Sequence, residues 1–185
     1  MSNKLAIIGG GELAKEMVNN LSNKYQITVF DHSKFNITDP ADIDQIIEYL
    51  LMYDIVVVTA GVHIEDAWRT WLVNTVGPCY LVSQLNKQAK NKHIIVLSTY
   101  GATWTSWPGI TDARLNYNNS KLALSNFMMG LTHQGGSSNR ITILEPSAFQ
   151  STMSDHTGAE IKSIVDQIDH TISSPVHIMK LTVKK

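Results

Sequence analysis

The chain has 185 residues, a length that suits one compact domain and is marginal for two. Hydrophobic residues make up 43% of it, enough for a core, and its single cysteine excludes a disulfide framework or a cysteine-based zinc cluster. A net charge of −1 argues against nucleic acid as a partner, and no apolar run is long enough to span a membrane, so we expect a cytoplasmic protein.

The first half of the sequence predicts strands that alternate with helices. Short apolar runs predict strands over 5–8, 27–30 and 55–58, and a shorter one over 35–37. Apolar residues at helical spacing predict helices over 12–21, 41–51 and 65–90. Gly77-Pro78 lies inside the last of these helices, where a proline predicts a kink.

The second half continues the alternation. It predicts strands over 93–97, 140–144 and 178–183, helices over 117–132 and 159–171, and irregular chain over 103–116 and 135–138. Strands that alternate with helices indicate an α/β fold with a doubly wound parallel sheet, in three layers α/β/α. Since no repeat or linker interrupts the pattern, we expect residues 1–185 to form a single domain.

A glycine-rich loop joins the first strand to the first helix. Gly9-Gly10-Gly11-Glu12-Leu13-Ala14 fits the pattern G-x-G-x-x-A. Glycines let the backbone approach a pyrophosphate, and the helix N-terminus offers it unpaired N–H groups. The alternative is a plain glycine-rich turn, but the position after an N-terminal strand favours a dinucleotide site.

Asp31 ends the second strand, about twenty residues after the glycine loop. A carboxylate at this place accepts hydrogen bonds from the adenosine ribose and repels a 2′-phosphate, which favours NAD over NADP. Ser33 and Lys34 leave NADP possible, because both can contact a 2′-phosphate.

Tyr117 and Lys121 form a Y-x-x-x-K pattern on a predicted helix. Residues four apart share a helix face, so the phenol and the ammonium can point into one site. A solvated surface pair is the simpler alternative. Ser98, at the end of the preceding strand, and Asn74, just before Gly77-Pro78, make a shared site the better interpretation.

With these motifs in this order, the chain resembles the short-chain dehydrogenase/reductase family over nearly its whole length. Five further segments are similar to family motifs: Ile37-Thr38-Asp39, Ala60-Gly61, Val73 to Pro78, Leu97 to Gly101, and Pro146 to Thr152. The resemblance implies a Rossmann fold and an NAD(P)-dependent oxidoreductase. It also implies hydride transfer between the nicotinamide and a small alcohol or ketone, with tyrosine as general acid/base.

The resemblance also assigns residues. It makes Asn74, Ser98, Tyr117 and Lys121 catalytic. Lys121 would lower the pKa of the phenol, Ser98 would orient the substrate oxygen, and Asn74 would hold a water. Cofactor contacts fall on Gly9, Gly11, Glu12, Leu13, Asp31, Asp39, Ala60, Gly61, Tyr117, Lys121, Pro146, Ser147 and Ser151.

The chain departs from the family pattern at several places. Val58-Thr59 replaces two asparagines, and Ser147 stands where a glycine is usual. Nineteen residues separate Ser98 from Tyr117, more than is usual, so we expect the segment with Trp104 and Trp107 to form a loop over the substrate pocket. A second substrate loop is expected near 150–172.

Two other functions stay open. A dinucleotide-binding sensor or scaffold without turnover fits the altered motifs, and sugar-nucleotide chemistry fits the long spacing after Ser98 but not the short chain. The histidines show no ligand spacing, so we expect no metal site. We expect a homodimer or homotetramer built on the 65–90 and 117–132 helices, unless the large side chains there are core: Trp68, Trp71, Phe127, Met128 and Met129.

Overall fold

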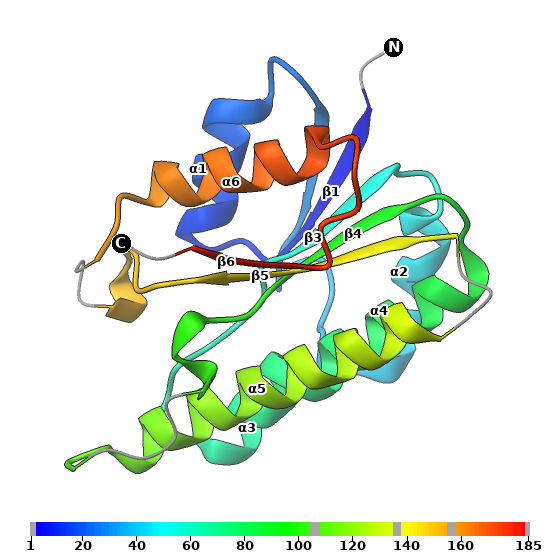
Figure 1. Ribbon diagram of the computed structural model, residues 1–185. Helices are drawn as coiled ribbons and strands as arrows, with labels where there is room; N and C mark the ends of the chain where they lie inside the picture. The colour runs from blue at the N-terminus through cyan, green and yellow to red at the C-terminus, as the bar shows by residue number, and fades with distance from the viewer. Residues whose placement is uncertain (1–2, 104–107, 135–137, 155–157, 184–185) are drawn as a thin grey trace.

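The computed structural model describes residues 3–103, 108–134, 138–154 and 158–183. Its centre is a six-stranded sheet with the strand order β2-β1-β3-β4-β5-β6, in which all neighbouring strands are parallel (Figure 1). The strands are β1 (Lys4–Ile8), β2 (Gln26–Phe30), β3 (Ile55–Val58), β4 (His93–Leu97), β5 (Arg140–Pro146) and β6 (Lys180–Val183).

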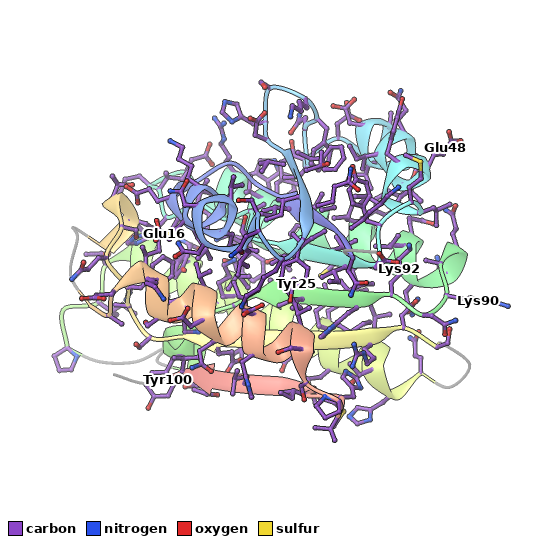
Figure 2. All side chains as sticks on the ribbon, turned by 90° about the horizontal axis from the view of Figure 1, so that it is seen from above. Glu16, Tyr25, Glu48, Lys90, Lys92 and Tyr100 are labelled. Carbon is purple, nitrogen blue, oxygen red and sulfur yellow. The ribbon has the colours of Figure 1, made fainter. Side chains whose placement is uncertain are left out.

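Helices cover both faces of the sheet (Figure 1). On one face lie α1 (Glu12–Leu21) and α6 (Ile161–Ser173), and on the other lie α2 (Pro40–Leu50), α4 (Gly77–Gln88) and α5 (Asp112–His133). Figure 2 looks down on the α1 and α6 face, where Tyr25 donates a hydrogen bond to Asp169 of α6 at 2.9 Å. The expected three-layer, doubly wound α/β fold is therefore confirmed.

The central strands are apolar on both sides because both of their faces are covered. In β3, Val56 and Val58 pack into the core beneath α2, α4 and α5. Ile55 and Val57 pack into the second core, beneath α1 and α6. Successive side chains of a strand point to opposite faces, so a run of β-branched residues fits a strand between two helical layers.

The strand order fixes where a ligand can bind. The chain passes from β1 outward to β2 on one side and then returns to β3 on the other, so the order reverses beside β1. Open parallel sheets bind ligands at the carboxyl ends of their strands at such a reversal. Gly9, Asp31, Thr59 and Ser98 each follow one of the strands β1 to β4 at this edge.

The strand predicted over 35–37 is absent from the sheet. The backbone turns after β2 instead, and the N–H groups of Lys34 and Phe35 both donate to the carbonyl of Asp31. Phe35 and Ile37 are nevertheless buried in the core beneath α2 and α4. Packing against helices, not strand pairing, explains why these two residues are apolar.

The long helix predicted over 65–90 is built from three pieces. They are α3 (Ala67–Trp71), a π-helical turn η1 (Leu72–Val76), and α4, which begins at Gly77. A Cβ on Gly77 would lie 2.1 Å from the carbonyl oxygen of Ile37, so glycine is required for this close approach. A kink was expected at Gly77-Pro78. The irregular part of the helix is instead the π-helical turn immediately before these two residues.

The start of α5 also differs from the prediction. The helix α5 begins at Asp112, five residues before the predicted start, because the hydroxyl of Thr111 caps it by accepting the N–H of Arg114. Short 3-10 helices, η2 (Tyr100–Thr103) and η3 (Thr152–Ser154), follow β4 and β5. The expected pocket loop with Trp104 and Trp107 lies outside the described residues.

Candidate functional site

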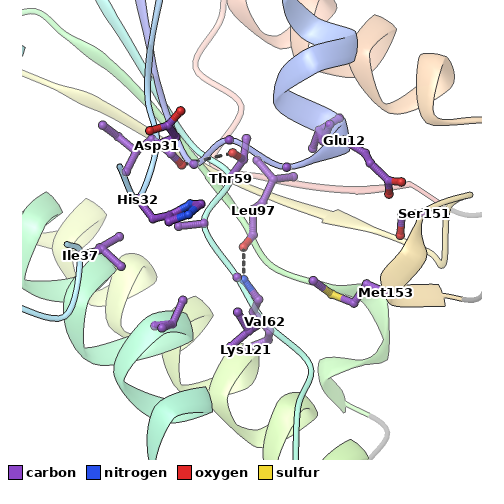
Figure 3. A pocket seen from close by; sticks show the side chains of 18 of the residues that line it. Glu12, Asp31, His32, Ile37, Thr59, Val62, Leu97, Lys121, Ser151 and Met153 are labelled. Atoms are coloured by element: carbon purple, nitrogen blue, oxygen red, sulfur yellow. Dashed lines mark hydrogen bonds between the residues drawn. The ribbon is translucent and has the colours of Figure 1, made fainter. Parts of the chain in front are cut away.

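A groove of about 860 Å³ opens along the carboxyl edge of the sheet (Figure 3). Twelve of the site residues expected from the sequence line it: Gly9, Gly11, Glu12, Leu13, Asp31, Ala60, Gly61, Ser98, Tyr117, Lys121, Pro146 and Ser151. The other three, Asn74, Asp39 and Ser147, do not appear in its wall. The fold therefore brings most of the predicted site together in one cavity.

The glycine loop forms one end of the groove. Gly9 has a φ of +121°, and a Cβ there would lie 2.7 Å from the hydroxyl of Thr59. That hydroxyl donates to the carbonyl of Ile8 at 3.1 Å, so threonine supplies a sheet contact where asparagine was expected. Gly11 is the N-cap of α1, has no side-chain cap, and has open space within 4 Å of a would-be Cβ. The first N–H groups of α1 are thus free to bind an anion in the groove.

Asp31 lines the groove beside the glycine loop, where a Cβ on Gly10 would lie 2.6 Å from the Cβ of Asp31. Its carboxylate accepts hydrogen bonds from the backbone and the hydroxyl of Ser33, at 3.0 and 2.6 Å. These bonds hold the pKa of Asp31 below its usual value, so the group is a carboxylate at neutral pH. Lys34 donates its ammonium to the carbonyl of Val29 at 2.7 Å.

Asp39 is a helix cap in this structure. Its carboxylate accepts the N–H of Ala41 at 2.9 Å and caps α2. The assignment of Asp39 to the cofactor is therefore corrected, since capping directs the side chain to α2. The residues of this segment that line the groove are Asn36, Ile37 and Thr38.

Asn74 is fully buried in the π-helical turn. Its amide accepts the N–H of Val62 at 2.7 Å and donates to the Val62 carbonyl at 2.9 Å and to the Ser120 hydroxyl at 3.1 Å. The side chain thus clamps the chain after β3 to α5.

Lys121 projects from α5 into the groove and is buried. Its ammonium donates to the carbonyl of Leu97 at 3.0 Å (Figure 3). A Cβ on Gly61 would lie 3.0 Å from this nitrogen, so a small residue there leaves room for it. Burial lowers the pKa of Lys121 to about 8, because desolvation disfavours the charged form.

Tyr117 lies one turn before Lys121 and also lines the groove. Burial raises the pKa of its phenol, while the charge of Arg114 and a hydrogen bond from Thr99 act in the opposite direction. The expected lowering of this pKa by Lys121 is wrong for this structure, because the ammonium is directed to the Leu97 carbonyl. The rings of Tyr117 and His63 lie 5.1 Å apart between centroids.

The two hydroxyls after β4 have different surroundings. Ser98 donates to the carbonyl of Lys121 at 3.1 Å and lies 2.7 Å from the hydroxyl of Ser125, so it faces α5. Thr99 is the neighbour whose hydroxyl acts to lower the pKa of the Tyr117 phenol. Thr99 was not predicted as a site residue, although Ser98-Thr99 places two hydroxyls side by side in the sequence.

A buried carboxylate extends the contacts of Ser98. Ser125 donates to Glu145 of β5 at 3.1 Å, and Lys180 of β6 forms an ion pair with the same carboxylate at 2.9 Å. Glu145 is 5% exposed. No sequence motif predicted this group, because its partners come from two other elements, α5 and β6.

The segment after β5 closes the far end of the groove. Pro146 and Ser151 line it, whereas Ser147 turns its N–H to the carbonyl of Val183 at 2.7 Å. Glu12 reaches across from α1 and accepts the N–H of Thr152 at 2.9 Å, and Figure 3 shows its carboxylate directed toward Ser151. This bond joins the glycine loop to η3.

Two other features are absent from the described part of the chain. No helix there combines the length and the apolar character needed to cross a membrane. Within the same residues, no three His, Cys, Asp or Glu side chains gather as ligands for a metal ion.

Comparisons with known proteins give similarity in structure alone. No protein-family model and no curated protein matches the chain. A short-chain dehydrogenase from Burkholderia cenocepacia J2315 in complex with NADP matches with a TM-score of 0.80 and 13% identity, over 100% of this chain and 89% of that one. A short-chain dehydrogenase/reductase from Serratia marcescens BCRC 10948 matches with a TM-score of 0.78 and 15% identity, over 99% of this chain and 97% of that one.

A third similar structure is dTDP-4-dehydrorhamnose reductase from Bacillus anthracis str. Ames in complex with NADP. It matches with a TM-score of 0.77 and 16% identity, over 100% of this chain and 75% of that one. Similarities at such low identity establish the architecture. The chain therefore has the Rossmann-like fold of the short-chain dehydrogenases/reductases.

Proposed function

We propose that the protein is an NAD(P)-dependent oxidoreductase acting on a small alcohol or carbonyl compound. The observation that carries this proposal is one groove that holds Tyr117, Lys121 and the uncapped N-terminus of α1. Two proteins of similar fold were crystallised with NADP, which supports a nicotinamide dinucleotide as the ligand.

The residues of the groove fit such a ligand. The open N–H groups after Gly11 would hold the pyrophosphate, and the Asp31 carboxylate would accept a ribose hydroxyl. Lys121 and Ser151 line the other end, where the nicotinamide would lie. Asp31 favours NAD(H), although four of the similar structures hold NADP or NADPH.

The bound cofactor would give or take the hydride, and this chain's residues would handle the proton and the geometry. Because burial raises the pKa of Tyr117, its phenol stays protonated at neutral pH and suits a proton donor. We therefore propose that reduction is favoured at neutral pH and that oxidation needs a more alkaline solution, in which the phenolate forms. Thr99, whose hydroxyl acts to lower the pKa of the phenol, would orient the substrate oxygen in place of Ser98.

We also propose that the protein is a homodimer or homotetramer. Trp68 of α3 is 72% exposed and Phe127 of α5 is 41% exposed. These two helices pack against each other within the subunit, so both side chains present apolar surface from one region.

The replacement Tyr117→Phe tests the assignment of the proton donor. We expect it to lower kcat by roughly 10²–10⁴-fold, because only the transferable proton is lost. The dinucleotide Kd should stay unchanged. A panel of small ketones and alcohols supplies the assay, and Tyr49→Phe, at an exposed position on α2, is the matched control.

Thr99→Val and Ser98→Ala separate the two hydroxyls in the same assay. Thr99→Val should lower kcat, and Ser98→Ala should be milder because its hydroxyl bonds to α5. Near-normal turnover by Tyr117→Phe would show that the proton assignment is wrong. A dinucleotide that binds without any turnover would favour a sensor or scaffold.

A further inference from the structure

Glu12 brings a negative charge into the groove at the first position of α1. Among the described residues that line the groove, Asp31 is the other acidic one, and it follows β2, where the adenosine ribose is proposed to bind. Glu12 accepts the N–H of Thr152 at 2.9 Å, and Figure 3 shows its carboxylate directed toward Ser151 and away from Asp31. The two carboxylates therefore belong to different halves of the groove.

Two contacts fix the place of the Glu12 carboxylate. Its backbone belongs to the first turn of α1, and its side chain is bonded to the backbone of η3. Ser151, Thr152 and Met153 all line the groove, so the carboxylate lies against the wall that this segment forms. The residue is half-buried, and water therefore screens its charge less than it screens a charge on the open surface.

The same half of the groove contains the proposed proton donor. Tyr117 and Lys121 of α5 line the groove, as does Pro146, which ends β5 just before the η3 segment. A proton and a hydride go to adjacent atoms of one carbonyl group, so the nicotinamide must lie near Tyr117 for the transfer. A dinucleotide that runs from Asp31 past the glycine loop thus brings its nicotinamide to the half that contains Glu12.

We propose that Glu12 makes the groove distinguish the two redox states of the dinucleotide, in favour of the oxidised one. The inference rests on the proposed function and adds a determinant of its cofactor specificity. The oxidised nicotinamide ring is positively charged and the reduced ring is neutral, whereas the rest of the dinucleotide is the same. A fixed negative charge beside the ring attracts the oxidised form alone. Repulsion between Glu12 and the pyrophosphate weakens the binding of both forms equally.

The same charge would assist reduction. In reduction, the carbonyl carbon accepts the hydride of the reduced dinucleotide and the oxygen accepts the proton of Tyr117, which solvent then replaces. Positive charge develops on the ring as the hydride leaves, and a carboxylate that Thr152 already holds in place stabilises this charge without having to reorient. Glu12 would then act in the same direction as the protonated phenol of Tyr117.

The test is the ratio of the dissociation constants of NADH and NAD⁺, or of NADPH and NADP⁺ if that pair alone binds, titrated without a substrate. Glu12→Gln keeps an oxygen that can accept the N–H of Thr152 but removes the charge. It should lower the ratio of the reduced-form Kd to the oxidised-form Kd by roughly 3- to 30-fold. Asp31→Asn removes the same charge beside the adenosine ribose, which both forms share, and should leave the ratio unchanged.

Glu12→Ala separates the charge from a purely structural role, because it removes both the charge and the bond to η3. If Glu12→Gln keeps the wild-type ratio and Glu12→Ala alone changes it, the inference is overturned. An equal change in Asp31→Asn would overturn it as well, since the effect would then be one of overall charge. Lys121 and Arg69 add positive charge to the lining, so the change in the ratio, and not its absolute value, is decisive.

Binding and turnover together separate this inference from the proposed function. If the dinucleotides bind but nothing is turned over, the proposed function fails, and the ratio still decides the role of Glu12. If a substrate is turned over and the ratio does not change, the inference alone fails. Absence of binding by every one of these dinucleotides would overturn both. The effect of Glu12→Gln should also shrink between about 0.01 M and about 1 M salt, because salt screens the charge.

Discussion

Asp31 is the residue on which the choice of dinucleotide depends. We expect the protein to bind NADH more tightly than NADPH, because this ionised carboxylate repels a 2′-phosphate. Asp31→Ala should narrow or reverse the preference, measured as the ratio of the two Kd values. Asp39→Ala, which removes a carboxylate that caps α2 outside the groove, is the control. Tighter NADPH binding by the wild type would contradict the prediction.

His93 is held in its neutral form by neighbours on both sides of its ring. Thr142 donates to the carbonyl of Ile178, so its hydroxyl oxygen accepts from Nε2 of His93 at 3.0 Å. Nδ1 then faces a guanidinium nitrogen of Arg140 at 3.4 Å and acts as an acceptor. Burial and this positive charge lower the pKa of His93 to about 4.

Acid should therefore destabilise the fold through His93. The unfolded chain binds a proton near pH 6.5 and the folded chain only near pH 4, so the free energy of unfolding falls as pH drops through this interval. The loss amounts to about 3 kcal/mol. Urea unfolding at pH 7 and at pH 4.5 measures it. His93→Gln should flatten this dependence, and His133→Gln, exposed at the end of α5, should not. Equal slopes in both variants would refute the assignment.

Two glycines of the loop between β1 and α1 have different roles, one in the stability of the fold and the other in dinucleotide binding. Gly9→Ala forces a side chain into positive φ and against Thr59, and we expect it to lower the free energy of unfolding by about 1–3 kcal/mol. Gly11→Ala meets no atom within 4 Å, so the fold should stay stable while its methyl group obstructs the anion site. Thermal unfolding and dinucleotide titration of both variants measure the two effects. If Gly11→Ala binds the dinucleotide with unchanged affinity, the pyrophosphate does not bind at this loop.

Elements with a strong hydrophobic period were predicted from the sequence, and the others were not. The β-branched run of β3 and the spaced apolar residues of α1 gave the correct type and nearly correct bounds. Phe35 and Ile37 gave a false strand, because burial against a helix and burial in a sheet select the same residue types. The first turn of α5 was missed because polar residues fill it and only the Thr111 cap marks it.

In the site, too, positions on a single helix were predicted from the sequence, whereas contacts between separate elements were not. Spacing along one helix predicted that Tyr117 and Lys121 share the groove, and this is what the structure has. Spacing did not reveal whether Ser98 or Thr99 meets the phenol, because that depends on how β4 docks against α5.

The whole molecule has a candidate interface on α3 and α5. Trp68 and Phe127 are exposed there, but Met128 is fully buried and Met129 packs against the core, so these two methionines do not belong to the expected contact. We expect light scattering to give a particle larger than 20.6 kDa at micromolar concentration. Trp68→Glu should dissociate it, whereas Tyr49→Glu, at an exposed site on α2, should not. A 20.6 kDa particle would rule the assembly out.

The groove takes its lining from the whole length of the sheet edge, from Gly9 after β1 to Met153 after β5. Strands far apart in the chain must pair before these loops meet, and parallel pairing of this kind forms late in folding. A ligand in the groove consequently recognises only the completed fold. By mass action, a ligand at a hundred times its Kd adds about 2.7 kcal/mol to the stability of the entire chain. Occupancy of the groove would thereby protect even distant segments, such as the edge strand β6, from proteolysis that proceeds through global unfolding.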